Sequence, residues 1–269
     1  MKIHGLSKVE LVEHAKGLDL DVKGKKKTDL VEDILAHRRS IIDAARSNSS
    51  CLELITEDIN RIANRYASAL DSKITERKQE MKRDDNSHYL IYRVLGISYE
   101  DGSLIDQYQN TGRFLYKYAG AFLEEVAILC LFYANSEGSR KLVKNNQGSK
   151  PKTFEIDFLN GNDAIEIKWR DATTDGDHIT KEHTRASVIK SYGYTPIRVM
   201  FYYPQREQAK KVQESLKSIY KGLDGEYYAG DEAWSYIQQV SGYDLKAILM
   251  DIADERDRID AEQNKDGQA

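Results

Sequence analysis

Two acidic residues and a lysine lie close together in an otherwise apolar part of the sequence. Asp157 precedes Glu166 by nine positions, and Lys168 follows Glu166 by two. A spacing of two places Glu166 and Lys168 on the same face of a β-strand. Two neighbouring carboxylates are costly without a cation between them, and oxygen ligands with open water positions suit Mg²⁺. We therefore expect Asp157, Glu166 and Lys168 to form a magnesium-dependent catalytic centre.

The predicted centre has further candidate ligands. Asp157, Glu166 and the backbone carbonyl of Ile167 are expected to hold the metal, while Lys168 orients or helps to deprotonate an attacking water. Glu124 or Glu125, in the preceding helix, could complete the shell, with Glu124 as the candidate. A capping or solvated role explains these two glutamates equally well.

Chance could produce an acid followed by Glu-x-Lys in so charged a chain, where a surface ion pair is the usual explanation. The neighbouring residues argue against chance, because they are apolar on both sides of the acids. They form two short runs, 153–159 and 164–169, separated by Asn160-Gly161-Asn162. An Asn-Gly turn between such runs predicts a β-hairpin that brings the acids together. Charge inside core strands needs a partner or a function.

The other elements follow from periodicity. A long helix is predicted over 113–134, a loop over 135–150, and a third strand over 196–203. Further helices are expected at 178–190, 205–223, 231–240 and 245–260. The predicted fold class is α/β, with a mixed central sheet flanked by helices and a helical N-terminal part. The glycines at 222, 225 and 230 follow a helix and are expected to be turn glycines, not a dinucleotide-binding fingerprint.

The N-terminal third is predicted to be helical. Residues 1–38 form a two-helix module in which Ser7 and Glu10 make a capping box, with a basic turn between the helices. Residues 39–104 form a charged helical region with an apolar stripe, and residues 105–269 form the catalytic domain. An intramolecular helix pair and a dimer interface both explain the stripe. The stripe consists of Ile41, Ile42, Ala45, Leu52, Ile55, Ile59, Ile62 and Tyr66.

Composition limits the class of protein. The net charge is −4, and residues 251–269 account for all of it, so net charge neither supports nor excludes a nucleic-acid partner. The two cysteines, Cys51 and Cys130, lie in apolar segments and suggest buried thiols in a reducing compartment. The sequence shows neither an apolar N-terminal signal nor a membrane-spanning run, so we expect a cytoplasmic protein.

The motifs resemble two families. Ile156-Asp157 and Glu166-Ile167-Lys168 resemble the PD-(D/E)xK nuclease superfamily, with Ile156 where proline often stands. The runs 166–185 and 196–204 resemble the ApaLI-like type II restriction endonucleases, and this likeness covers roughly residues 105–257. The resemblance implies Mg²⁺-dependent hydrolysis of double-stranded DNA at a short GTGCAC-like palindrome, leaving 5′-phosphates. It also implies a homodimer, because each active site cuts one strand of a symmetric site, with no membrane and no nucleotide cofactor.

DNA contacts are predicted in two places. The polar stretch from Arg170 to Arg185 follows the catalytic lysine, and Arg170 and Arg185 are expected to read guanine edges. Lys181 and His183 would bind phosphates, although a solvated loop explains these residues about as well. In the N-terminal module, the leucine spacing and Gly24-Lys25-Lys26 resemble the SAP DNA-binding motif, which implies phosphate contacts from Lys25, Lys26 and Lys27.

Two other functions fit the same residues. A repair or structure-specific nuclease would share the catalytic residues but recognise DNA by its shape. A non-catalytic SAP-type DNA-binding protein would use the acids only structurally. Metal-dependent cleavage separates the non-catalytic binding protein from both nucleases. Discrete fragments from a large DNA separate a restriction endonuclease from a repair or structure-specific nuclease.

Overall fold

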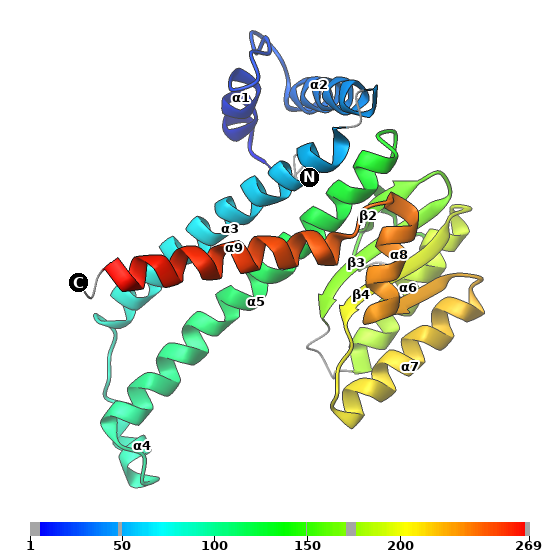
Figure 1. The fold of residues 1–269 in the computed structure, drawn as a ribbon. Helices are drawn as coiled ribbons and strands as arrows, with labels where there is room; N and C mark the ends of the chain where they lie inside the picture. Colours follow the sequence, from blue (N-terminus) through cyan, green and yellow to red (C-terminus); the bar gives the residue numbers. More distant parts are fainter. Residues whose placement is uncertain (1–5, 48–49, 149, 171–175, 267–269) are drawn as a thin grey trace. The chain divides into compact units, whose positions relative to one another are not determined.

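The computed structural model describes residues 6–47, 50–148, 150–170 and 176–266 (Figure 1). Contacts divide the chain into two units, of which unit 1 comprises residues 1–58 and 124–269 and unit 2 comprises residues 59–123. The long helices α3 (Cys51–Met81) and α5 (Tyr99–Ala134) each run through both units. The predicted boundary at residue 38 falls within α2 (Lys27–Ser47), and the one at residue 104 falls within α5.

Unit 1 is built on a mixed five-stranded sheet, in the order β1-β2-β3-β4-β5. β1 pairs antiparallel with β2 and β2 antiparallel with β3, whereas β3, β4 and β5 are parallel. The predicted α/β class with a mixed sheet is confirmed. The strands are β1 (Ser139–Lys144), β2 (Thr153–Asn160), β3 (Asp163–Arg170), β4 (Thr195–Tyr202) and β5 (Glu226–Ala229).

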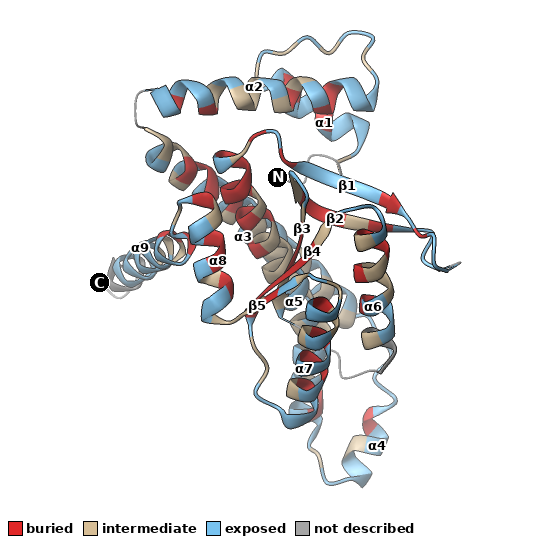
Figure 2. Ribbon diagram, turned by 90° about the vertical axis from the view of Figure 1, so that its right-hand side faces the viewer, coloured by how far each residue is buried: buried red, intermediate tan, exposed pale blue. Residues whose placement is uncertain are grey.

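Helices cover both faces of this sheet. α6 (Gly176–Ser191) connects β3 to β4, and α7 (Glu207–Gly222) connects β4 to β5, both on one face (Figures 1 and 2). α8 (Asp231–Ser241) lies on the other face, where the rings of Trp234 and Phe201 are 4.4 Å apart. Six of the eight residues of β4 are buried, as expected for a central parallel strand covered on both sides.

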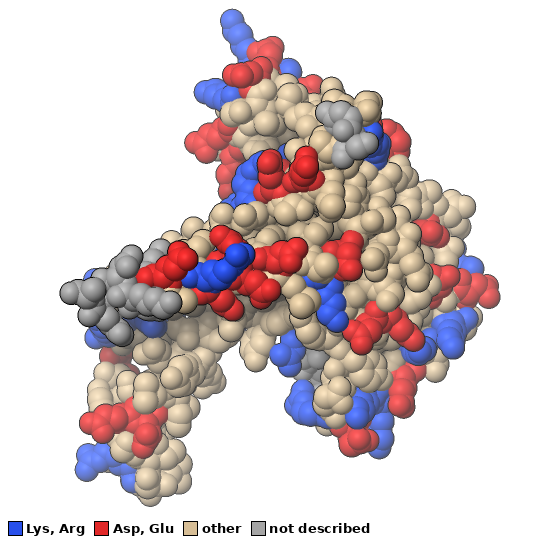
Figure 3. All heavy atoms as spheres, in the orientation of Figure 1, with Lys and Arg blue, Asp and Glu red and all other residues tan. Residues whose placement is uncertain are grey.

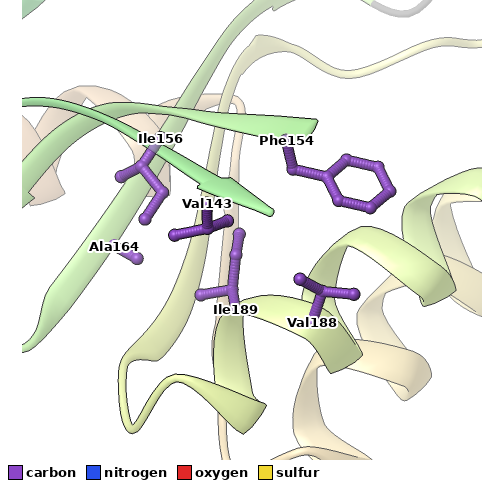
Figure 4. Close-up of a cluster of buried hydrophobic side chains, with 6 residues drawn as sticks. All are labelled: Val143, Phe154, Ile156, Ala164, Val188 and Ile189. Carbon is purple, nitrogen blue, oxygen red and sulfur yellow. The ribbon is translucent and has the colours of Figure 1, made fainter. Parts of the chain in front are cut away.

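Two apolar clusters hold α6 and α7 on the sheet. In the first, Val188 and Ile189 of α6 pack against strand side chains, among them Phe154 and Ile156 (Figure 4). The second joins Ala186 and Met200 to three residues of α7, namely Val212, Leu216 and Tyr220. Removing such apolar surface from water stabilises the packing by about 25 cal/mol per Å². Helix α6, which bears the predicted DNA contacts Lys181, His183 and Arg185, is therefore held firmly against the sheet.

Three elements differ from the sequence prediction. The predicted loop 135–150 contains β1, in which only Val143 is buried, so this edge strand shows no apolar alternation. β5 is four residues long and lies between Gly225 and Gly230, where the prediction expected a turn. α5 begins at Tyr99, well before the predicted start at residue 113.

The N-terminal helices form a small apolar core. α1 (Lys8–Lys16) begins with the predicted capping box of Ser7 and Glu10, and it packs on α2 (Lys27–Ser47). The side chains of Leu11, Leu30 and Ile34 are fully buried between them. Since capping and helical periodicity depend on residues close in sequence, these two helices could be predicted from the sequence alone.

Unit 2 contains the rest of α3, the short helix α4 (Tyr89–Val94) and the N-terminal part of α5. Ile59 and Ile62 are buried, and the ring of Tyr66 packs edge-on against Phe122 at 5.9 Å. The apolar stripe of α3 is therefore covered within the chain along these residues. α4, its C-cap residue and α5 in turn expose large apolar side chains, among them Leu90, Ile91, Val94, Leu95, Leu104, Ile105 and Tyr108.

The surface of the final helix is charged. Acidic side chains gather along α9 (Leu245–Asp266) (Figure 3), the segment in which the sequence concentrates its negative charge. Among the described helices, none combines the length and the apolar character that a membrane crossing requires. Both cysteines are free thiols, and burial raises the pKa of Cys130 to about 12.

Candidate active site

The predicted hairpin is present and positions the two acids. Phe158 pairs with Ile165 and Asn160 pairs with Asp163 across a tight turn. Gly161 in this turn has φ +59, a left-handed backbone conformation that glycine adopts without strain. The hairpin therefore brings Asp157, which precedes Phe158, close to Glu166, which follows Ile165.

A bulge in β2 decides where Asp157 points. Ser139 of β1 lies opposite Leu159, but Lys141 lies opposite Ile156, so β2 has one extra residue in this interval. Such a bulge shifts the alternation of side chains by one position. Ile156 packs with the cluster beneath α6, and after the bulge Asp157 shares the face of the sheet that carries Glu166.

Asp157 is buried, with 8% of its surface exposed, and one of its two carboxylate oxygens accepts a hydrogen bond from the backbone. Its Oδ2 accepts a hydrogen bond of 2.8 Å from the backbone N–H of Ile167. Burial, followed by the negative charges of Glu166 and Glu124, raises the pKa of Asp157 well above its usual value. Asp157 thus experiences the negative charges of both Glu166 and Glu124. Glu124, the candidate ligand, contributes to this shift through its negative charge.

Glu166 is held by two cations. Lys168 Nζ pairs with its Oε1, and Arg185 Nη1 donates to its Oε2. Burial alone would raise the pKa of Glu166, which is 2% exposed, but the positive charges of Lys168 and Arg185 outweigh that effect and lower it. The carboxylate of Glu166 is therefore ionised at neutral pH.

Lys168 also remains charged, because neighbouring groups of opposite charge compensate for its burial. Burial disfavours its ammonium, yet the negative charges of Glu166 and then Asp157 outweigh burial and raise the pKa of Lys168. Its side chain keeps 34% of its surface exposed. A protonated amine that reaches solvent can donate hydrogen bonds to a water or a phosphate, and this favours an orienting role over that of a general base.

A buried ion-pair network lies behind Glu166, and the sequence prediction assigned it no role. Arg198 of β4 is fully buried and lies opposite Glu166 in the parallel ladder. Its Nη1 donates to Oε2 of Glu182 at 2.8 Å, while Nε of Arg185 lies 3.7 Å from Oε1 of the same glutamate. An arginine between Ile197 and Val199 was a signal in the sequence, because a charge inside a central strand needs a partner.

The predicted DNA-contact residues divide into two groups. Arg170, Lys181 and His183 are exposed, and the guanidinium of Arg170 lies 5.6 Å from the centre of the Trp169 ring. Arg185 instead points inwards, since Nη1 contacts Glu166 and also donates to the backbone oxygen of Glu155 at 3.2 Å. The guanidinium of Arg185 therefore makes its contacts inside the protein, whereas a side chain that reads a base edge must be exposed. Residues 171–175 of the predicted base-reading stretch lie outside the described residues.

The basic turn of the N-terminal module is only partly available to a ligand. Lys25 Nζ forms an ion pair of 2.7 Å with Asp33. Lys26 and Lys27 are exposed, and the backbone N–H of Lys26 donates to Asp29 at 3.0 Å. Lys26 and Lys27 are therefore the lysines of this turn that present their charge to solvent.

The acids suit a hard cation better than a soft one. Asp157, Glu166 and Glu124 offer only carboxylate oxygens, and the backbone oxygen of Ile167 is of the same kind. Within the described ranges, no three His, Cys, Asp or Glu side chains are close enough to hold a metal by themselves. A cation here would therefore keep several waters, as Mg²⁺ usually does. The residues present fit such an ion.

Comparison with protein families gives evidence that is independent of this geometry. The model of the ApaLI-like restriction endonucleases matches residues 32–254, which is most of the chain. The chain belongs to the ApaLI-like restriction endonuclease family. It matches no curated protein and no solved structure. The protein is therefore a restriction endonuclease, a nuclease whose substrate is DNA.

Family membership also changes how the N-terminal third is understood. The match to ApaLI-like endonucleases starts at residue 32, within α2, whereas the sequence prediction limited the likeness to about residues 105–257. α3, α4 and all of α5 thus belong to the family region. α1 and the basic turn lie before it, so the likeness to a SAP motif has no support from the match.

Proposed function

We propose that this endonuclease is a type II restriction enzyme that hydrolyses both strands of duplex DNA at a short palindrome of the GTGCAC kind. It uses Mg²⁺ and leaves 5′-phosphates. The observation that supports this proposal best is the convergence of Asp157, Glu166 and Lys168 on one face of the β2–β3 hairpin.

Each residue of this centre has a proposed role. Asp157, Glu166 and the backbone oxygen of Ile167 would hold Mg²⁺. Glu124 would join them as a further ligand only after its side chain moves closer, since the described structure does not bring three acids around one point. Bound Mg²⁺ supplies positive charge that stabilises the phosphodiester during in-line attack. Lys168 donates hydrogen bonds that orient the attacking water and the phosphate. Arg185, which contacts Glu166, positions that carboxylate and does not read a base.

DNA binding and assembly follow from the palindrome. Arg170, Lys181 and His183 are proposed to contact DNA next to the centre, because they are exposed and follow Lys168 closely in sequence. A symmetric site requires two symmetric active sites, so we propose a homodimer. The exposed apolar side chains of α4 and α5, such as Leu90, Ile91 and Leu104, resemble those that dimer interfaces bury.

Cleavage of a large DNA of known sequence tests the proposal. We expect discrete fragments with Mg²⁺ and none with EDTA, and sequencing of the fragment ends will give the site and the terminal phosphates. Lys168→Ala is expected to lose at least about a hundredfold in rate, since one well-placed group in such a centre contributes about that much. A smear of products, or cutting only at junctions, would favour a structure-specific nuclease instead. Intact DNA, or full activity of Lys168→Ala, would refute catalysis at this centre.

The N-terminal module is proposed to bind phosphates through Lys26 and Lys27. The double replacement Lys26→Gln, Lys27→Gln should weaken binding equally for all sequences. It should also reduce the slope of log K against log salt by about 2, because each phosphate contact releases counterions. Filter binding over a range of salt concentrations measures both. Lys25→Gln is the matched control with a smaller expected change, since Lys25 pairs with Asp33. An unchanged slope in the double variant would contradict the proposal.

A further inference from the structure

An aromatic and basic pocket lies just beyond the candidate active site. It encloses about 580 Å³ at the carboxyl ends of β3 and β4. Trp169 and Tyr202 line it together with Arg170, Gln205 and Arg206. This volume is within the range of about 300–1,000 Å³ that is usual for small-ligand sites. The catalytic roles proposed above do not use the pocket.

The rings of the pocket form a corner. The Trp169 and Tyr202 rings stand nearly perpendicular, at 86°, with centroids 6.4 Å apart. Tyr202 is the last residue of β4 and leaves 52% of its surface exposed, although burial would be favourable for so large a ring. The guanidinium of Arg170 lies close to the Trp169 ring, and the Trp234 ring meets the Tyr202 ring at 88° and 6.4 Å. Tyr202 is exposed whereas Trp169 is only partly exposed, so the Tyr202 ring is the more open platform. A planar ligand could stack on this ring.

The polar groups indicate which planar ligand fits. Arg170 and Arg206 bring two positive charges to the pocket, which suits a ligand that carries phosphate. The amide of Gln205 both donates and accepts hydrogen bonds, as the edge of a nucleobase does. An aromatic platform, an amide and two guanidinium groups together match a nucleotide. Single-stranded nucleic acids are bound by stacking and charge of this kind.

The location points to DNA as the source of that nucleotide. Arg170 follows Lys168 by two residues on one strand, which is roughly 6–7 Å at about 3.3 Å per residue. Arg170 is also the ladder partner of Tyr202. On the premise of the proposed function, we propose that this pocket binds one unstacked nucleobase of the substrate strand, close to the scissile phosphate. Enzymes that move a base out of the duplex bind it in pockets of this kind.

Binding of short oligomers without metal tests this inference. The probes are a dye-labelled thymidine tetranucleotide and a tetramer of abasic deoxyribose phosphates of the same charge, both measured by fluorescence anisotropy in EDTA. The wild-type protein should bind the thymidine tetramer roughly 5- to 150-fold more tightly, the range expected for stacking one base. Tyr202→Ala should remove this preference, while Tyr202→Phe, which keeps the ring, should retain it.

Control variants separate the contribution of base stacking to binding from that of charge and from a loss of folding. Arg206→Gln should weaken both tetramers by a similar factor, because it removes a phosphate contact. Tyr202 is half exposed, so Tyr202→Ala should fold, and circular dichroism verifies this. Equal binding of the two tetramers by the wild type, or a preference that persists in Tyr202→Ala, would overturn the inference. No cleavage is involved, so failure of the proposed function would instead show as intact DNA with the base preference preserved.

Discussion

Asp157→Asn should abolish cleavage and at the same time stabilise the metal-free protein. The asparagine Oδ1 can still accept the hydrogen bond from Ile167, but the charge next to Glu166 and Glu124 is lost. Loss of a metal ligand should reduce the rate roughly a thousandfold or more, because the charge stabilisation involved amounts to several kcal/mol. Cleavage rates and thermal unfolding in EDTA measure the two effects.

The stabilisation should depend on pH with a definite sign. The pKa of Asp157 is raised in the folded state, so its protonated form contributes stability at low pH, and this contribution is lost as pH rises through the folded pKa. The asparagine side chain of the variant carries no charge at any pH. The gain in melting temperature should therefore be large at pH 8 and small near pH 4, close to the pKa of a free aspartate of about 3.9.

Two outcomes would contradict this prediction. A lower melting temperature at pH 8 would mean that the Asp157 charge stabilises the fold, as in an ordinary buried ion pair. Unchanged cleavage would remove Asp157 from the catalytic centre. Asp231→Asn is a suitable control, because its side chain is 93% exposed and pairs with Lys246 on the surface. It should change neither measurement appreciably.

Arg198→Met should destabilise the protein by about 3–5 kcal/mol, the usual cost of removing one partner from a buried ion pair. Arg198 is fully buried and donates to Glu182, which is 6% exposed. Methionine fills similar space but leaves the negative charges of Glu182 and Glu166 less well compensated. Urea unfolding of the metal-free protein measures the loss in free energy.

A double replacement distinguishes charge from packing in this network. Adding Glu182→Gln to Arg198→Met removes the uncompensated carboxylate, so much of the lost stability should return. Lys246→Met serves as the exposed control, with an expected change below about 1 kcal/mol. If the double variant is as unstable as Arg198→Met alone, packing and not charge accounts for the loss. A loss below about 1 kcal/mol in Arg198→Met would show that the buried network does little for stability.

The two strands that sequence analysis missed share a physical cause. The edge strand β1 has a single buried side chain, Val143, and β5 has only four residues, so neither shows apolar alternation. Pairing with a neighbouring strand makes them strands, and that pairing involves residues distant in sequence. The early start of α5 was missed for a different reason, because Gly102 and Gly112 weaken the helical preference of its N-terminal part.

The sequence alone determined the local features of this endonuclease. The Asn160-Gly161 turn, the apolar runs on either side and the capping box depend on neighbours in the chain, so the hairpin that carries Asp157, Glu166 and Lys168 could be predicted. The run of residues after Lys168 was enough to suggest the family.

Only the tertiary structure decided how the side chains of the centre are used. The bulge in β2 sets the direction of Asp157 through its register with β1. The position of α6 turns Arg185 towards Glu166, and the parallel pairing of β3 with β4 places Arg198 opposite that glutamate. Register, helix packing and ion pairing join residues far apart in the chain, and no local pattern in the sequence encodes them.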